Sequence, residues 1–249
     1  GDIDLKTAKE SVEASFGSWK DKSDSMLGAV GRAMAPTPKV ILVNQPQAVQ
    51  STIIAGHAIA PFNATSNTEL TVLNAIFGGA FEARINMNLR EDKGWSYGMY
   101  SGVQSNRSGD QTLTVSGSVQ TDKTMESMQE IKQEFDEFLS TNPARDDELQ
   151  RVKLNRTRSQ PGRFATKRGF LQSMMASDSF GLPFDYAEGA AERLNAVSLQ
   201  RVSARAAELM HPEELIWVIV GDLSEIEEKV RLLNYGEVEV WDGFGNKVR

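Results

Sequence analysis

The chain of 249 residues contains no cysteine. Disulfide bonds, thiolate metal sites and a cysteine nucleophile are therefore excluded. Histidine is scarce as well, because only His57 and His211 occur and they lie far apart in the sequence. A hydrolytic zinc ion needs three protein ligands, usually histidine and carboxylate, and an open position for water. An independent catalytic zinc site is therefore not expected in this chain.

Long apolar runs and an excess of positive charge are also missing. No apolar run approaches the roughly 20 residues needed to cross a bilayer, so we expect no membrane span. The formal net charge of −7 argues against nucleic acid and against an anionic membrane as partners. A hydrophobic content of 40% and a charged content of 24% are typical of a globular domain with an ordinary core.

The most informative stretch begins with an amphipathic pattern over residues 68–93. Apolar side chains recur there every three or four positions and share one helix face: Leu70, Leu73, Phe77, Ala80 and Phe81. Gly94 is a plausible end for this helix, and the following residues alternate as a strand. Glycine costs roughly 1 kcal/mol against alanine inside a helix, so the pair Gly78-Gly79 indicates that another backbone packs closely there. An ordinary packing site and a functional one both explain that pair.

The remaining elements follow from the same kinds of pattern. Strands are predicted over 39–43, 50–59, 97–104, 112–119 and 215–220. Further helices are predicted over 122–139, over 146–177 with a disturbance at Pro161-Gly162, near 185–193, over 198–210 and over 223–233. This order predicts an α+β fold in which helices cover a sheet, mostly on one face.

Two motifs in this stretch carry a family resemblance. Residues 73–85 read Leu-Asn-x-x-Phe-Gly-Gly-x-Phe-x-x-Arg-Ile, and residues 89–97 read Leu-Arg-Glu-x-Lys-Gly-x-x-Tyr. Together they resemble the non-catalytic, C-terminal half of the pitrilysin-like zinc peptidases, a family that includes insulin-degrading enzyme and the mitochondrial processing peptidases. The resemblance implies a mixed, mostly antiparallel β-sheet of about five or six strands covered by α-helices.

The same resemblance predicts that this half is inactive alone. Active halves of the family carry His-x-x-Glu-His on a helix, in which the histidines bind zinc and the glutamate is the general base. In the best register that motif falls on Leu70, Leu73 and Asn74, and none of these can bind zinc or accept the proton. We therefore expect no metal and no cofactor in this chain, with zinc held by a partner half.

The resemblance also singles out Arg90 and Tyr97, which occupy positions that in the family reach across a closed cavity to the partner's zinc site. A tyrosine hydroxyl can donate to the oxyanion that forms during peptide hydrolysis. An arginine presents a planar fork that can hold substrate carbonyls or a carboxylate. Without the resemblance, Arg90 would be interpreted as a cation at a helix end and Tyr97 as an ordinary strand aromatic.

Two stretches of the chain share a pattern that suggests a tandem duplication. Residues 1–17 and 221–236 both begin with Gly-Asp, continue as a charged helical segment and end in an aromatic-Gly step. We interpret residues 1–20 as the tail of a preceding homologous domain and expect the chain to be a piece of a longer precursor. Residues 21–38 have a linker composition with interrupting glycines and prolines. Residues 39–235 would then form the inactive peptidase domain, and 236–249 a C-terminal tail.

A cluster of basic side chains follows the second predicted helix. Its members are Arg145, Arg151, Lys153, Arg156, Arg158, Arg163, Lys167 and Arg168. A solvated helix face explains such a cluster, and so does a lining for acidic peptide segments.

The leading hypothesis is a non-catalytic half of a zinc metalloendopeptidase. It would dock on an H-x-x-E-H half, in the same polypeptide or in a separate subunit, and would bind peptide substrate through Arg90 and Tyr97. The alternative is a scaffold that kept the fold and lost peptidase work, and a third hypothesis is a stand-alone peptide-binding domain. Many bacterial relatives are exported, so the resemblance favours a periplasmic location, and a cytoplasmic one stays open.

Overall fold

The computed structural model describes residues 2–20, 37–105 and 110–249. The strands are β1 (Lys39–Asn44), β2 (Gln50–Ile59), β3 (Ser96–Ser105), β4 (Gln111–Gln120), β5 (Ile216–Gly221) and β6 (Glu237–Trp241). The α-helices are α1 (Leu5–Phe16), α2 (Asn67–Phe77), α3 (Arg84–Asn86), α4 (Thr124–Leu139), α5 (Asp146–Arg163), α6 (Lys167–Ser179), α7 (Ala190–Asn195), α8 (Leu199–Leu209) and α9 (Leu223–Leu232). Short helical turns are η1 (Met87–Asp92), η2 (Thr121–Lys123) and η3 (Pro212–Glu214). Within these ranges no helix has the length and apolar character needed to cross a membrane.

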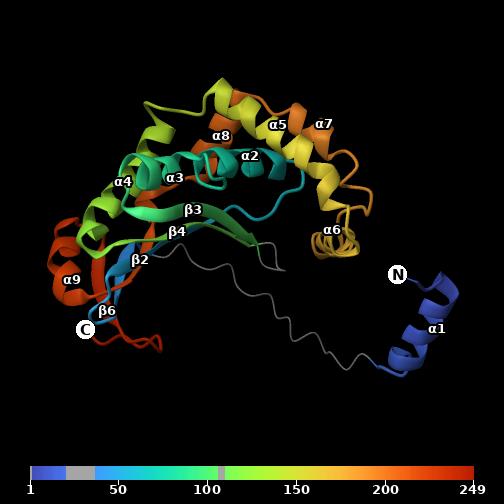
Figure 1. The fold of residues 1–249 in the computed structure, drawn as a ribbon, viewed down its shortest axis with the longest axis horizontal. Helices are drawn as coiled ribbons and strands as arrows, with labels where there is room; N and C mark the ends of the chain where they lie inside the picture. The colour runs from blue at the N-terminus through green and yellow to red at the C-terminus, as the bar shows by residue number, and fades with distance from the viewer. Residues whose placement is uncertain (1, 21–36, 106–109) are drawn as a thin grey trace.

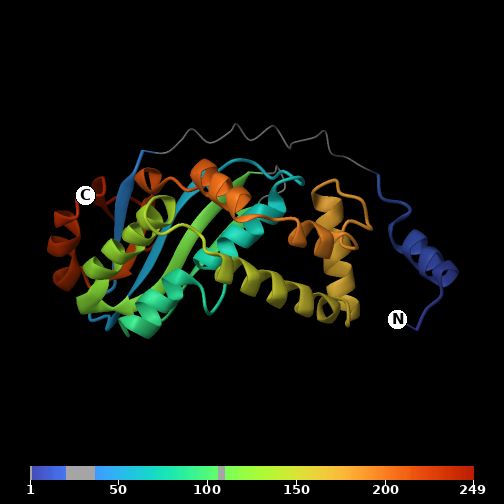
Figure 2. The same cartoon turned by 90° about the horizontal axis from the view of Figure 1, so that it is seen from above.

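Six strands form one mixed sheet in the order β3-β4-β2-β5-β1-β6. The pairs β3–β4, β4–β2 and β2–β5 are antiparallel, whereas β5–β1 and β1–β6 are parallel. Helices α2, α3, α4, α5 and α8 lie together over one face of the sheet (Figures 1 and 2). The predicted α+β fold, with a mixed and mostly antiparallel sheet under helices, is confirmed.

The core lies between the sheet and these helices. Every second side chain of β2 is buried, as expected for a strand with one face on the core. Phe77 of α2 meets Phe135 and Phe138 of α4 with ring centroids 4.5 and 5.6 Å apart, both edge to face. Trp217 of β5 is fully buried and lies 5.6 Å from the Tyr235 ring. Such aromatic pairs add to the hydrophobic energy of their burial, so they fix α4 on α2 and the chain end on β5.

The helix predicted over 68–93 is interrupted. The α-helix α2 ends at Phe77, residues 78–83 form turns, and helical structure resumes as α3 followed by the π-helical turn η1. The break occurs at Gly78-Gly79, where the Gly78 carbonyl accepts a hydrogen bond from the backbone N–H of Ser101 in β3. The Gly78 carbonyl therefore binds to strand β3 of the sheet at the point where α2 ends.

The C-terminal segment predicted as a tail contains a strand of the sheet. Residues 237–241 form β6, which pairs in parallel with β1 at the edge of the sheet. Glu239 of β6 is paired with Lys39 of β1 and with Lys247, at 3.2 and 3.0 Å. The sheet therefore continues beyond residue 235, where the sequence pattern placed the end of the domain.

The N-terminal segments stand apart from this architecture. Helix α1 begins after Asp4, whose side chain accepts from the Thr7 N–H, and none of its residues is buried. Its interpretation as the tail of a preceding domain stays a prediction. Of the expected linker at 21–38, residues 21–36 lie outside the described residues.

Candidate functional site

The junction between α2 and β3 is held by close backbone contact. A Cβ atom on Gly78 would lie 2.6 Å from the Ser101 Oγ and 2.7 Å from the Ser101 nitrogen. The Ser101 hydroxyl donates to the Asn74 side-chain oxygen at 2.7 Å. The predicted close approach of another backbone at Gly78 is confirmed, and no larger residue fits there without displacing β3.

The positions that align with the zinc motif serve packing. Leu70 and Leu73 are buried in the core, and Asn74 is engaged by Ser101 as described. In the described part of the chain, no group of three or more His, Cys, Asp or Glu side chains could hold a metal ion. The side chains at these positions do not fit a zinc site.

Arg84, the arginine of the first motif, anchors the junction to α5. Its guanidinium binds the Glu148 carboxylate through two bonds, Nε–Oε1 at 2.7 Å and Nη2–Oε2 at 2.6 Å. It also donates to the carbonyls of Asn142 and Pro143 and lies 4.8 Å from the centre of the Phe138 ring. Both charged side chains are buried. Because all three guanidinium nitrogens are engaged, Arg84 is a structural residue that ties α3, and the η1 turn that follows it, to α5.

Arg90 and Tyr97 are brought together at the end of η1. The Arg90 Nη1 donates to the Tyr97 carbonyl at 2.7 Å, and its Nε lies 3.0 Å from the Glu91 carboxylate. The Arg90 guanidinium also lies 4.7 Å from the centre of the Phe81 ring. Gly94, with φ of +67°, reverses the chain between η1 and β3, which confirms the predicted helix end. A π-helical turn widens the helix by one residue and is often found at functional sites.

A β-bulge sets the direction of the Tyr97 side chain. Ser96 pairs with Val119 and Met99 with Gly117, so two residues of β3 oppose one of β4. The Ser96 hydroxyl lies 2.7 Å from the Ser118 carbonyl and accepts from the Gly98 N–H at 3.0 Å. Met99 is consequently buried while Tyr97 is 86% exposed. Within the described ranges the Tyr97 hydroxyl has no hydrogen-bond partner.

The neighbouring charges are paired with α4. The Lys93 ammonium lies 2.9 Å from the Glu130 carboxylate and 5.3 Å from the centre of the Trp95 ring. Burial alone would raise the pKa of Glu130, but hydrogen bonds from Lys93 and Asn88 outweigh it and leave this pKa lowered. The same hydrogen bond raises the pKa of Lys93. Lys93 therefore connects the end of η1 to α4 and is also partly exposed to solvent. Local sequence did not predict this contact with α4.

The two histidines meet on the helix-covered face of the sheet, between β2 and the chain that follows α8. His57 of β2 is 4% exposed, and its ring centroid lies 5.7 Å from that of His211. The His57 Nδ1 faces the Ala58 carbonyl at 3.0 Å, and its Nε2 accepts from the His211 N–H at 3.4 Å. This arrangement suits a neutral ring that donates at Nδ1, and burial lowers the pKa of His57. The pair packs η3 against β2.

Comparison with known families assigns this architecture. Residues 1–156, more than half of the chain, match the family model described as the Peptidase M16 inactive domain. The chain belongs to the Peptidase M16 inactive domain family. The resemblance found in the motifs at 73–85 and 89–97 is thereby confirmed, and the peptidase M16 match includes α1 and extends into α5.

Solved structures of a peptidase M16 inactive domain and of two proteases share the fold. The peptidase M16 inactive domain from Pseudomonas fluorescens superposes with a TM-score of 0.68 at 19% identity, covering 75% of this chain and 44% of that one. A protease from Helicobacter pylori gives 0.73 at 12% identity, covering 89% and 53%. The periplasmic protease PqqL from Escherichia coli gives 0.67 at 15% identity, covering 89% and 24%.

The chain thus spans about half the length of the first two of these structures, and less of the third. No curated protein matches its sequence. At such low identity the structural similarity establishes the fold, while the roles of Arg90 and Tyr97 stay predictions.

Proposed function

We propose that this M16 inactive domain is the non-catalytic half of a zinc metalloendopeptidase. It docks on an H-x-x-E-H half, carried by the same precursor or by a separate subunit, and the zinc ion belongs to that half. Tyr97 and Arg90 contribute transition-state stabilisation and substrate binding to peptide hydrolysis. The observation that carries the proposal is the exposed Tyr97 hydroxyl, held on a β-bulge beside Arg90 with no internal partner among the described residues.

The energetics of Tyr97 support a role outside the domain. An aromatic side chain that is 86% exposed contributes little burial to its own fold. The bulge and the Arg90–Tyr97 carbonyl bond nevertheless hold its backbone in one conformation. Preorganised donors of this kind stabilise a developing oxyanion most effectively when a partner surface excludes water from them.

The open face of the sheet supports peptide binding. The helices cover one face of the sheet (Figure 1). The side chains of β2 and β4 on the other face are mainly small or hydroxylic. They include Thr52, Gly56, Thr114, Ser116 and Ser118. Such a surface leaves room for an extended chain between this domain and a partner half.

A specific observation favours the alternative function as a scaffold. The Arg90 guanidinium is already engaged by the Tyr97 carbonyl, the Glu91 carboxylate and the Phe81 ring. An arginine with three internal contacts can be retained for structure alone. In the scaffold alternative the domain docks on its partner in the same way, but neither Arg90 nor Tyr97 affects turnover.

Co-expression with the partner tests the proposal. The coding region next to that of this chain is read for H-x-x-E-H, and the encoded half is produced with and without this domain. We expect the two to co-purify and to cleave a quenched-fluorescent peptide only together, with the activity abolished by a chelator. Peptide cleavage by this chain alone, or full activity of the other half alone, would contradict the proposal.

For the location we propose the periplasm. PqqL, which has the same fold, is a periplasmic protease of Escherichia coli. Fractionation of the producing cells, with the chain detected by antibody, distinguishes a periplasmic from a cytoplasmic protein.

A further inference from the structure

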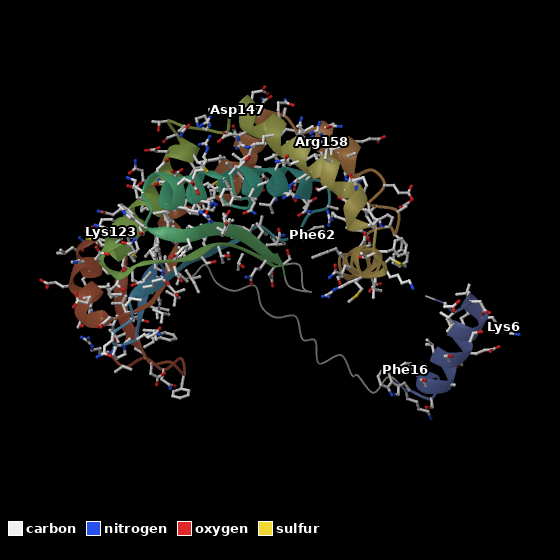
Figure 3. All side chains as sticks on the ribbon, in the orientation of Figure 1. Lys6, Phe16, Phe62, Lys123, Asp147 and Arg158 are labelled. Atoms are coloured by element: carbon white, nitrogen blue, oxygen red, sulfur yellow. The ribbon has the colours of Figure 1, made fainter. Side chains whose placement is uncertain are left out.

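A cavity distant in the fold from Arg90 and Tyr97 opens between the beginning of α2 and helices α5, α6 and α7. Its volume is about 540 Å³, within the range of roughly 300–1,000 Å³ typical of clefts that hold small ligands. Most of its lining follows residue 156, beyond the part of the chain that matches the M16 family model. Phe62 marks this place in Figure 3, near α6.

The charge of this cavity is of one sign. Arg156, Arg163 and Arg193 line it, and none of its lining residues, all within the described ranges, is Asp or Glu. In a protein with a net charge of −7, three cations without a facing carboxylate form a local exception. Such a concentration of charge at a concave surface attracts an anion.

Two of these arginines have no side-chain partner among the described residues. Arg193 lies 3.8 Å from the centre of the Tyr186 ring and donates to the Tyr186 carbonyl. Arg156 and Arg163, by contrast, make no hydrogen bond or ion pair through their side chains with any described residue. Arg156 is partly buried, and burial, followed by the charge of Arg163, lowers its pKa. A guanidinium stays protonated, so this unfavourable environment is relieved only by an anion or by water.

Three other basic side chains, at the beginning and in the first half of α5, have partners. Arg145 at the beginning of α5 is paired with Asp147 and Glu148, and Arg151 with Glu82. Lys153 donates to the Asn195 carbonyl at 2.9 Å. Arg158 makes no side-chain hydrogen bond or ion pair with a described residue either, but it is exposed and lies outside the cavity. The unpaired arginines that line the cavity are Arg156, which is partly buried, and Arg163.

The rest of the lining is suited to a peptide. Phe62 and Phe180 stack with centroids 4.2 Å apart, and Phe164 adds a third ring, which together provide an apolar wall. Asn67 and Gln172 bring amide groups that can bond a peptide backbone. A guanidinium fork matches the two oxygens of a carboxylate.

We propose that this cavity binds a carboxylate of a short peptide segment, from an acidic side chain or from a free C-terminus. Arg156 and Arg163 hold the carboxylate, and a neighbouring apolar side chain packs on Phe62, Phe164 and Phe180. The peptide as the ligand class rests on the proposed function. The site itself needs no partner half, so the isolated chain is sufficient to test it.

Calorimetric titration of the 249-residue chain with four matched peptides is the test. All are N-acetylated and contain one Phe; they end in Phe-Glu-amide, Phe-Gln-amide, Phe carboxylate and Phe amide. We expect binding of one or both acidic peptides and at least tenfold weaker binding of the neutral ones, with the two acidic peptides separating a side-chain from a terminal carboxylate. Arg156→Gln should weaken acidic-peptide binding by about ten- to a hundredfold, as expected for a charge-assisted hydrogen bond. Arg158→Gln removes the same charge from an exposed position of α5 outside the cavity and should leave affinity unchanged (Figure 3).

A second measurement tests the unpaired state of Arg156 directly. Without peptide, Arg156→Gln should raise the thermal midpoint of unfolding, because it removes a partly buried charge that has no counter-ion. Arg163→Gln provides an independent variant if Arg156→Gln folds poorly. Equal affinity for acidic and neutral peptides, an equal loss in Arg158→Gln, or no binding at millimolar peptide would each overturn the proposal. Binding of inorganic phosphate without acidic peptide would replace it with a phosphate site. Because no partner is present, these failures would leave the role of Tyr97 untouched.

Discussion

The η1–β3 junction and the α5–α7 cavity use arginine in opposite ways. At the junction Arg84 is buried and bound to Glu148 and two carbonyls, and Arg90 is engaged by the Tyr97 carbonyl and Glu91. At the cavity Arg156 and Arg163 face open space without a described partner. Arginines of the first kind stabilise the domain through internal contacts. Arginines of the second kind keep a charge that is available to a ligand.

Within the junction the same contrast recurs on a smaller scale. Arg84 is buried with its carboxylate, whereas Arg90 and Tyr97 lie at the surface. Arg84 stabilises the segment of the fold that carries Arg90 and Tyr97. Loss of Arg84 should therefore unfold or loosen the domain, and loss of Tyr97 should change only what the assembled protein does.

The largest effect is expected for Arg84→Met. It leaves the buried Glu148 carboxylate without its cation, which typically costs about 3–5 kcal/mol of unfolding free energy. Arg151→Met, which removes an exposed partner of Glu82, should cost at most about 1 kcal/mol. Denaturant unfolding of both variants measures the difference. Equal losses of unfolding free energy in the two variants would contradict the distinction between a buried structural arginine and a surface arginine.

Tyr97→Phe comes next and should act on turnover. The hydroxyl donates best to the oxyanion, which exists only in the transition state. Loss of one such donor typically costs about 2.7–4 kcal/mol, or on the order of a hundred- to a thousandfold in kcat. Tyr235→Phe, at a ring that packs on the buried Trp217 of the core, serves as the control and should keep wild-type kinetics. Wild-type kcat for Tyr97→Phe in an assembled pair would favour the scaffold alternative.

Arg90→Ala is expected to have a smaller effect of a different kind. If Arg90 holds substrate carbonyls in the ground and transition states alike, its loss raises KM and changes kcat little. A charge-assisted hydrogen bond is worth about 1.5–3 kcal/mol, which corresponds to roughly a ten- to a hundredfold change. Steady-state kinetics of the reconstituted pair, with circular dichroism to verify folding, gives the result. A loss confined to kcat would instead place Arg90 at the transition state.

The smallest effect is expected from His57, whose two ring hydrogen bonds require the neutral imidazole. Burial lowers its pKa below the model-peptide value of 6.5, with Ala58, His211, Glu213 and Glu214 as the surrounding groups. As the pH falls below about 6.5 the unfolded chain takes up a proton that the folded chain resists, so the unfolding free energy decreases. Above that pH both states are neutral and the contribution is constant. Unfolding at pH 7.5 and pH 5.5 should show a smaller decrease in His57→Gln than in the wild type, with His211→Gln as the comparison.

Local sequence determined much of the architecture. Alternation and helical periodicity predicted five of the strands and the main helices, because each pattern reflects which side of one element meets the core. Gly94 was recognisable as a helix end, and the helix predicted from residue 198 begins there, where Ser198 accepts from the Arg201 N–H. Leu70 and Leu73 sufficed to exclude zinc ligation at the motif positions, since chemical identity alone decides that point.

The tertiary structure decided the rest, because it depends on groups distant in sequence. Strand β6 pairs in parallel with β1, some two hundred positions earlier, and its residues 237–240 alternate polar and apolar side chains over a stretch too short to distinguish a strand from a tail. The break after Phe77 follows from the backbone of Ser101, and the direction of Tyr97 from a bulge counted against β4. The basic side chains between residues 145 and 168 look alike in the sequence. Whether each of them pairs with a carboxylate depends on its neighbours in three dimensions. Only the folded chain distinguishes Arg151, which is paired, from Arg156, which is not.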